Sequence, residues 1–450
     1  MTRFPYGIAD FRRIRREGMV YVDRTAHIRD LESLGSILVF LRPRRFGKSL
    51  WVQTLATYYD LRYADAFDEI FDGLAVHGEP TPLRSRYFVL QLNLSRVTPR
   101  GSVDAIAESL RRHVRSRAEL FLKEYADHLA PTRVRPDDSA SEILDTVLGA
   151  VRQTDHPLYL LIDEYDNFVN EVMVEDVQTY QALFEAAGPY KELMKAVKNA
   201  TEGMGLERIF MTGVAPVALN DLTSGFNNAT DVSQEPELAA LCGFCEHEIH
   251  DVLLRRLGEQ VGRSGREVEE TLDLLRTWYN GYRFSEDADV LVYNPTNVLY
   301  FLSHLQRRAK PPKQLHDANL RTDQAKLAFL ARTAAGTGVI EQLTEGTGEI
   351  LVPRLLDAFS LGQLTAQLHG DASAVASFLY YMGLLTLSEE PGRLRVPNLV
   401  VRKLLLGAGG RKRLRRSLSS GAPGKPSSQR FRHPLRAQAR APQQAGEDEP

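Results

Sequence analysis

The chain has 450 residues, of which 43% are hydrophobic and 25% charged, and its formal net charge is −2, as in a globular protein of two or three domains. It has only two cysteines, which excludes a disulfide framework. It lacks both an apolar run of about eighteen residues and a secretion signal, so we expect a cytoplasmic protein with no membrane partner.

The first half of the chain alternates short apolar runs with longer segments of helical periodicity. Such alternation predicts an α/β fold, in which helices cover both faces of a mostly parallel sheet. We expect this fold to form one domain over residues 1–240. The expected strands are Ser36–Leu41, Tyr87–Leu94, Leu158–Ile162 and Arg208–Met211. The expected helices are Val103–Ala126, Ser141–Arg152 and Thr179–Ala200.

Helical periodicity dominates after the first domain and predicts a helical domain over residues 241–335. Its expected helices are Glu246–Val261, Arg266–Tyr279, Thr296–Arg307 and Asp323–Arg332. Two helices and a hairpin then predict a small winged-helix-like unit over residues 336–406. The expected helices of this unit are Val352–Gln367 and Ala374–Met382, and the expected hairpin strands are Leu384–Ser388 and Arg393–Val396.

Residues 407–450 lose this pattern. From Arg411 to Arg440, basic residues recur among Gly, Ser, Pro, Ala and Gln with no acidic residue between them. Such a segment has too little apolar surface to offset its ordering entropy, so we expect a disordered basic tail. The tail would bind nucleic acid weakly through phosphates, although most runs of this kind are merely solvated.

The segment Leu41–Trp51, which reads LRPRRFGKSLW, joins an expected strand to an expected helix. A phosphate-binding loop needs this arrangement, because N–H groups of the turn and of the helix N-terminus face the phosphates. In that interpretation Gly47 leaves room for the phosphates, Lys48 contacts them and Ser49 binds Mg²⁺. The alternative is a basic turn that leads into an amphipathic helix.

Five residues before this glycine complete the loop. Arg42 stands where the usual pattern has its first glycine, and Pro43 brings no N–H group to the phosphates. Arg44 and Arg45 would add positive charge, and we count them, together with Phe46, among the nucleotide-binding residues. The pattern assigns no role to Arg42.

The strand expected at 158–162 leads directly into Asp163 and Glu164. At the end of a buried strand, Asp163 would hold Mg²⁺ and Glu164 would polarise the attacking water, as in P-loop ATPases. The alternative is a solvated acid pair. Because open α/β sheets bind ligands at the carboxyl ends of their strands, the loop and the acid pair together favour ATP. Thr212, after another expected strand, would sense the γ-phosphate or simply end the strand.

Sequence blocks in one order extend from residue 4 to about residue 405, namely FPYGIADFRRIRREGMVYVDRT, FLRPRRFGKSL, LLIDEYD, MTGVAPVALNDLTSGFNNATD, LCGF, WYNGYRF, VYNPTNVLYFL, GLLTL and LRVPNLVVRKL. They resemble the bacterial AAA-ATPase-like family, whose loop commonly reads Arg-Pro-Arg-Arg-Phe-Gly-Lys-Ser. The resemblance implies the roles given above to the loop residues and the acid pair, and it implies a sensor position for Thr212. It also makes Arg42 an ordinary feature of the family.

The family typically carries a C-terminal PD-(D/E)XK nuclease-like domain as well. No Asp or Glu lies between Arg402 and Arg440, so we expect no nuclease activity and interpret the tail as a truncated or frame-shifted reading of a longer gene, or as a genuine disordered tail. We therefore expect an AAA-like ATPase that uses ATP and Mg²⁺ to drive a conformational change. The alternatives are a nucleotide-dependent binding switch and a nucleic-acid-processing subunit with little turnover of its own. The expected partner is a nucleic acid or a protein, and oligomer formation is left open.

Two further motifs have no place in this hypothesis. The segment CGFCEHEIH, residues 242–250, has ligand types suited to zinc, but their spacing is too compact for the usual site. Glu248 follows Cys245 by three positions, which favours a helix-capping box instead. The family's Tyr-Val-Asp-Lys-Thr corresponds to Tyr21–Thr25, with Arg24 in place of the lysine, and its role is unassigned.

Overall fold

The computed structural model describes residues 3–167, 179, 182–183, 188–216, 229–315, 327–356, 359 and 367–407. Residues 1–409 form one compact unit. The predicted tail lies outside the described residues, apart from residue 407. The predicted domain boundaries after residues 240 and 335 stay predictions.

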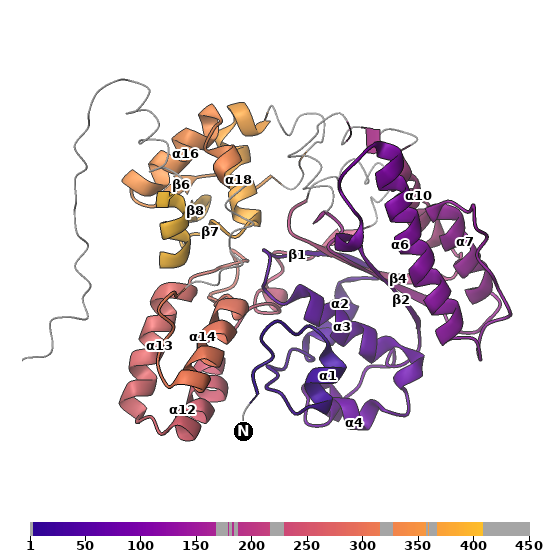
Figure 1. The fold of residues 1–450 in the computed structure, drawn as a ribbon, viewed down its shortest axis with the longest axis horizontal. Helices are drawn as coiled ribbons and strands as arrows, with labels where there is room; N and C mark the ends of the chain where they lie inside the picture. The colour runs from indigo at the N-terminus through magenta and orange to yellow at the C-terminus, as the bar shows by residue number, and fades with distance from the viewer. Residues whose placement is uncertain are drawn as a thin grey trace, which may run out of the picture. The chain divides into compact units, whose positions relative to one another are not determined.

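A parallel sheet stands at the centre of the described residues, with five strands in the order β2-β3-β4-β1-β5 (Figure 1). The strands are β1 (Ile37–Leu41), β2 (Phe88–Asn93), β3 (Leu158–Asp163), β4 (Leu206–Gly213) and β5 (Thr230–Asp231). All four predicted strands are confirmed. The short strand β5 was not predicted, and β4 runs on past its predicted end to include Thr212.

The strand order decides which loops meet. Strand β4 pairs with β1 on one side and with β3 on the other, all in parallel. In register, Leu41 at the end of β1 lies opposite Gly213, and Ile162 of β3 lies opposite Met211. The loop after β1 and the acid pair at the end of β3 therefore emerge at the same edge of the sheet, on either side of the end of β4.

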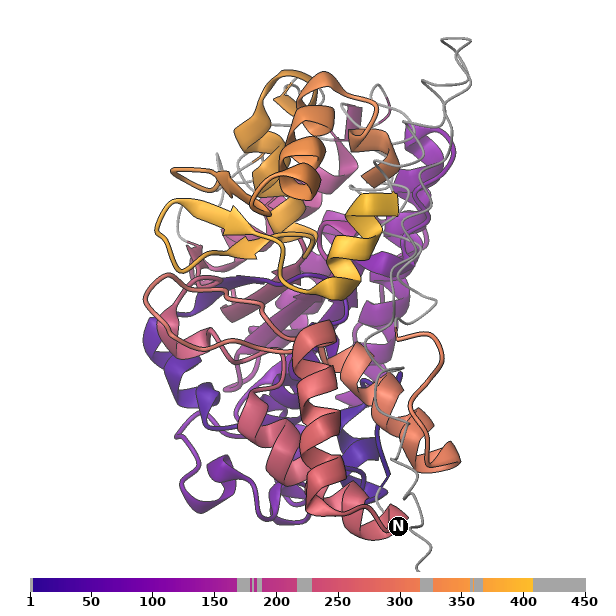
Figure 2. The same cartoon turned by 90° about the vertical axis from the view of Figure 1, so that its left-hand side faces the viewer.

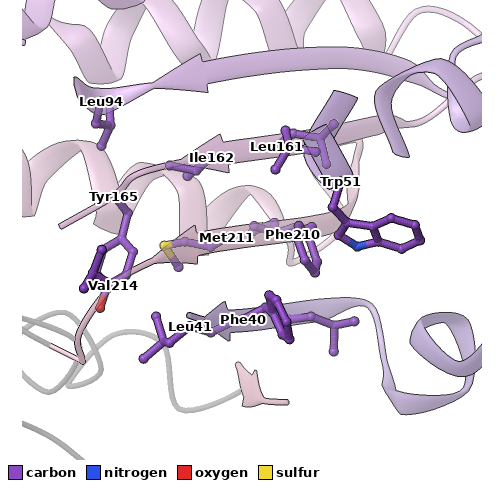
Figure 3. Packing of buried hydrophobic residues seen from close by; sticks show 14 of the residues in the cluster. Phe40, Leu41, Trp51, Leu94, Leu161, Ile162, Tyr165, Phe210, Met211 and Val214 are labelled. Atoms are coloured by element: carbon purple, nitrogen blue, oxygen red, sulfur yellow. The ribbon is translucent and has the colours of Figure 1, made fainter. Parts of the chain in front are cut away.

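The strands form because their side chains are apolar on both faces. Every residue of β1 and of β3 is buried, as expected of strands in a sheet covered on both sides. Figure 3 shows Phe40, Phe210 and Leu161 on three neighbouring strands, and the rings of Phe40 and Phe210 lie 6.3 Å apart. Burial of side chains of this size contributes about 1.5–3 kcal/mol each.

Helices cover both faces of the sheet. On one face α3 packs against β2 and β3, and α1 packs on α3, whereas on the other face α6 packs against β2 beside α7 and α10 (Figure 1). The α-helices of this region are α1 (Phe11–Arg16), α2 (His27–Leu34), α3 (Lys48–Tyr59), α4 (Phe67–Phe71), α5 (Ala75–Gly78), α6 (Val103–Glu124), α7 (Ala140–Val151) and α10 (Pro189–Ala200). The short 3-10 turns are Leu61–Tyr63, Leu94–Arg96 and Pro236–Leu238.

The predicted helical region has its own cluster of buried apolar residues. Its helices lie side by side and are drawn in salmon in Figure 2. They are a π-helix (Glu248–Leu254), α12 (Arg255–Val261), α13 (Gly265–Tyr279) and α14 (Pro295–Arg308). The sequence predicted one regular helix over 246–261, and the structure divides it into the π-helix and α12.

The predicted winged-helix-like unit contains the expected hairpin, in which β7 (Thr386–Leu387) pairs antiparallel with β8 (Arg393–Arg395). Its other elements are α16 (Ala334–Glu345), β6 (Glu349–Leu351) and α18 (Ala372–Tyr381). Strand β6, which was not predicted, pairs with β8, so the sheet has the order β6-β8-β7.

Three predicted helices need correction. In the helix predicted at 352–367, residues 352–356 are not helical, because Val352 donates its N–H to the Gly392 carbonyl at 2.8 Å and so extends the pairing of β6 with β8. Residues 357–358 and 360–366 lie outside the described residues. In the helix predicted at 179–200, residues 179, 182 and 183 are helical, but the non-helical Gly188 interrupts the helix before α10 starts at Pro189, and the remaining residues of 180–187 lie outside the described residues. Of the helix predicted at 323–332, the described part is helical only at 327–330.

Within the described ranges, no helix is both long enough and apolar enough to cross a lipid bilayer.

Candidate nucleotide-binding site

The loop between β1 and α3, which is the predicted phosphate-binding turn, has two residues with positive φ. Gly47 has φ 103° and precedes Lys48, the first residue of α3. Arg45 has φ 70°, which is an uncommon conformation for a residue with a side chain and typical of functional loops. The Phe46 ring packs edge-on against Tyr282 and Phe284, with ring centroids 4.9 and 5.3 Å away. Phe46 therefore ties the loop to the region that follows the sheet.

Lys48 lies almost completely buried at the centre of the loop. Its ammonium group donates to the carbonyl oxygens of Arg42 at 2.8 Å and Pro43 at 3.1 Å. Burial lowers the pKa of Lys48, and the carboxylates of Glu164 and Asp163 oppose this shift. The predicted phosphate ligand and the predicted acid pair thus lie in one electrostatic environment.

Asp163, the last residue of β3, is buried beside the loop. Its Oδ2 accepts a hydrogen bond from the side chain of Asn93 at 3.2 Å, and its Oδ1 has no hydrogen-bond partner among the described residues. Burial raises the pKa of Asp163, whereas Ser49 and Lys48 lower it. The two predicted metal ligands, Ser49 and Asp163, are therefore neighbours.

Glu164 follows β3 with φ 52°, a left-handed conformation that turns the chain sharply at the end of the strand. Burial raises the pKa of its carboxyl group, and Lys48 opposes the shift. Glu164 lines the same cavity as Gly47, Lys48 and Ser49. The structure brings this predicted catalytic residue next to the predicted phosphate loop.

Asn93 and Asp166 are site residues that the sequence analysis missed. Asn93, at the end of β2, lies opposite Asp163 in register. Asp166 is fully buried and accepts the N–H groups of Val214 at 3.0 Å and Ala215 at 2.9 Å, so it fixes the chain as it leaves β4. A polar residue at the end of an apolar run was the available signal for Asn93, whereas the partners of Asp166 lie too far along the chain to be recognised.

Arg42, which had no assigned role, points away from the phosphate turn. Its guanidinium group donates to the carbonyl oxygens of Ser233 and, at 3.0 Å, of Leu238. The same group lies over the rings of Phe40 and Phe284 at 4.4 and 4.3 Å. Arg42 therefore anchors the segment after β5 to the loop and is a structural residue.

Two predicted nucleotide-binding residues do not line the cavity next to the loop. Arg44 donates to the side chain of Asn167 at 2.5 Å, just beyond the acid pair. Thr212 is fully buried within β4, and its hydroxyl oxygen has no partner among the described residues. The proposed sensor role of Thr212 stays a prediction.

A cavity of about 340 Å³ adjoins the loop. The phosphate turn and Glu164 form part of its lining. We call the part lined by apolar residues from other segments of the chain the apolar compartment. Its lining includes Ile8, Val20, Leu241, Leu253 and Leu299.

A parallel sheet with a Gly-Lys-Ser loop after its first strand and an acid pair after a neighbouring strand defines the P-loop class of nucleoside triphosphatase folds. Residues 5–223 match the family model described as a predicted AAA-ATPase, AAA-ATPase-like. This part of the chain is similar to proteins of that family.

One similar protein is an uncharacterized protein in the vnfD 5′ region of Azotobacter chroococcum mcd 1. The two sequences are 27% identical over 412 residues, and the matched region covers 90% of this chain and 69% of that protein. Two solved structures are also similar. The Aeropyrum pernix ORC2 protein in its ADP form is 14% identical with a TM-score of 0.35, covering 90% of this chain and 98% of that one. The Aeropyrum pernix ORC1 protein in complex with DNA is 12% identical with a TM-score of 0.33, covering 88% and 95%.

Proposed function

We propose that the chain binds ATP together with Mg²⁺ in this cavity and hydrolyses it. The observation that carries the proposal is that Lys48, in the segment after β1, and Glu164, directly after β3, line one cavity, although β4 lies between these two strands in the sheet. Open α/β sheets bind their ligands at this edge. The match of residues 5–223 to predicted AAA-ATPases supports the same activity.

The residues present fit a bound Mg²⁺ ion. The orphaned Oδ1 of Asp163 and the Ser49 hydroxyl are oxygen donors of the kind that Mg²⁺ prefers, and they are neighbours at the loop. When bound, Mg²⁺ neutralises charge on the phosphates. Asn93 holds the other oxygen of Asp163 and so orients the carboxylate.

In the proposed reaction, the Lys48 ammonium exchanges its bonds to the Arg42 and Pro43 carbonyl oxygens for bonds to phosphate oxygens. Glu164 orients the attacking water and accepts its proton, a role for which a buried carboxylate with a raised pKa is suited. Gly47 leaves the backbone of the turn accessible to the phosphates. A side chain there would be strained at a φ of 103°, and its Cβ atom would project into the open space next to the turn. The apolar compartment holds the nucleoside.

We further propose that turnover moves the helical region and the winged-helix-like unit relative to the sheet. The support is that both contact the phosphate loop directly. The Thr296 hydroxyl, at the start of α14, donates to the Arg45 carbonyl oxygen at 3.0 Å. Gly383, which follows α18, lies against Pro43.

The test is Mg²⁺-dependent ATPase activity of the wild type and of the Lys48→Ala and Glu164→Gln variants. We expect Lys48→Ala to lose ATP binding, and Glu164→Gln to retain it with turnover reduced by about 10²-fold or more. Equal activity in the wild type and Lys48→Ala would refute the proposal. Tight ATP binding without turnover, unchanged in Glu164→Gln, would make the protein a binding switch, and stimulation by DNA would favour the nucleic-acid-processing role.

A further inference from the structure

The two motifs that the proposed function leaves unexplained meet at the wall of the cavity. Arg24, from Tyr21–Thr25, and Glu248, from the 242–250 segment, form an ion pair although they lie 224 positions apart. Arg24 Nη2 donates to Glu248 Oε2 at 2.7 Å and to the Gly243 carbonyl oxygen at 2.8 Å, and Nη1 donates to Glu248 Oε1. The two side chains are only 12% and 11% exposed. The pair is therefore bidentate and largely shielded from water.

Arg24 is held by the sheet side of the molecule. The Tyr21 hydroxyl lies 3.3 Å from the Thr54 hydroxyl on α3, the helix that begins at the phosphate loop. Asp23 accepts the N–H of Ala75 at 2.6 Å, at the start of α5. The motif Tyr21–Thr25 thus fixes one wall of the cavity to the nucleotide-binding fold.

Glu248 is held by the helical region. It is the first residue of the π-helix, and its Oε2 accepts the N–H of Cys245 at 2.7 Å, which confirms the capping interaction that the sequence predicted. Phe244 exchanges backbone hydrogen bonds with Tyr293, close to the start of α14. At Gly243 a Cβ atom would lie 2.7 Å from the Val292 side chain, so glycine is needed for this close approach.

The ion pair joins the two walls of the apolar compartment. Val20, Tyr21, Val22 and Arg24 line the cavity on the first wall, and Leu241–Phe244 with Leu253 line it on the second. Arg24 lines the cavity itself and donates to Gly243, which lies on the second wall, and to Glu248. Burial lowers the pKa of Arg24, but the hydrogen bonds to Glu248 and its charge outweigh burial, so the pKa of Arg24 is raised overall.

We propose that Arg24 and Glu248 are positioning residues that hold the apolar compartment closed around the nucleoside and so set nucleotide affinity without acting on the phosphates. This inference rests on the proposed function, because it concerns the same cavity. Removing one partner leaves a buried charge unpaired and releases the 241–245 wall from the Tyr21–Thr25 wall. The phosphate turn, which depends on Lys48 and Gly47, keeps its contacts.

The test compares two ligands, ADP and inorganic pyrophosphate, by isothermal titration calorimetry. For Arg24→Met and Glu248→Gln we expect ADP to bind about tenfold more weakly or worse, while pyrophosphate stays within about twofold of the wild type. The double variant Arg24→Met/Glu248→Gln should regain part of the ADP affinity, because neither charge is then left alone. Arg24→Lys keeps the charge but reaches only one partner, so its ADP affinity should lie in between.

The matched control is Arg276→Met, which breaks the Arg276–Glu246 ion pair of the same helical region, outside the cavity lining. It should leave the affinity for both ligands unchanged.

The inference would be overturned if Arg24→Met and Arg24→Lys both bound ADP with an affinity within twofold of the wild type. It would also be overturned if these variants lost pyrophosphate binding to the same extent as ADP binding. If Arg24→Met does not fold, the ADP and pyrophosphate affinities of Arg24→Lys and Glu248→Gln test the inference in its place. A wild type that binds neither ligand refutes the proposed function itself, whereas pyrophosphate binding abolished by Lys48→Ala supports it.

Discussion

At the scale of one residue, the structure explains why Arg42 stands where the usual phosphate-loop pattern has a glycine. Its guanidinium group satisfies the carbonyl oxygens of Ser233 and Leu238, which lie 191 and 196 positions away. No local pattern points to partners at that distance, so the sequence alone left the role of Arg42 open. Gly47, Lys48 and Ser49 were recognisable because their chemistry depends on adjacent positions.

Arg42→Lys should lower the free energy of unfolding by about 1–3 kcal/mol, because a single ammonium group leaves one of two buried carbonyl oxygens without its donor. Urea unfolding followed by circular dichroism measures this. The control is Arg16→Lys on the exposed side of α1, for which we expect less than about 0.5 kcal/mol. A change in Arg42→Lys no larger than in the control would contradict the structural role.

At the scale of elements, the junction of β2 with α6 depends on a neutral histidine. His113 on α6 accepts the N–H of Asn93 on its Nε2 at 3.2 Å. Burial and the nearby Arg117 and Arg96 lower the pKa of His113 to about 4. The folded chain disfavours the charged imidazole. The contribution of His113 to the free energy of unfolding is therefore fully present above the unfolded pKa near 6.5 and is lost as the pH falls from there toward 4.

We therefore expect the wild type to lose about 1–2 kcal/mol more than His113→Gln between pH 7 and pH 4.5, after allowance for solvent screening of this partly exposed group. Glutamine keeps an acceptor for the Asn93 N–H but does not titrate. Urea midpoints measured across this pH range test the prediction. Parallel curves for the two proteins would contradict it.

The sequence predicted those helices and strands whose formation depends mainly on residues within the element itself. The four long strands are continuous apolar runs, and α6, α7, α13 and α18 have regular periodicity or good caps. Strand β5 has two exposed residues and owes its place to pairing with β1. Strand β6 exists because β8 lies beside it. Such elements depend on partners far along the chain, which no local window contains.

At the scale of the whole molecule, the predicted phosphate loop and the predicted winged-helix-like unit meet at one glycine. Gly383 has φ 75°, and a Cβ atom there would lie 2.7 Å from Cβ of Pro43. We expect Gly383→Ala to lower the free energy of unfolding by about 2–4 kcal/mol and to raise the KM for ATP, because it combines backbone strain with displacement of Pro43.

The matched control is Gly348→Ala, where φ is a similar 82° but the added methyl group would make only an ordinary contact, 4.0 Å from the Leu343 carbonyl oxygen. It should lose only about 1 kcal/mol, from backbone strain, and keep the wild-type KM. Thermal unfolding and steady-state ATPase kinetics on both variants separate the two effects. If the two variants behave alike, the contact between Gly383 and Pro43 does not couple this unit to the loop.

The central place of β4 also governs when the site assembles during synthesis. The phosphate loop and the acid pair are complete in the chain by residue 164, but the strand that separates and aligns them ends only at Gly213. Pairing at such a sequence separation is slow compared with helix formation. A nascent chain on the ribosome therefore carries both halves of the predicted site before it has the strand that aligns them.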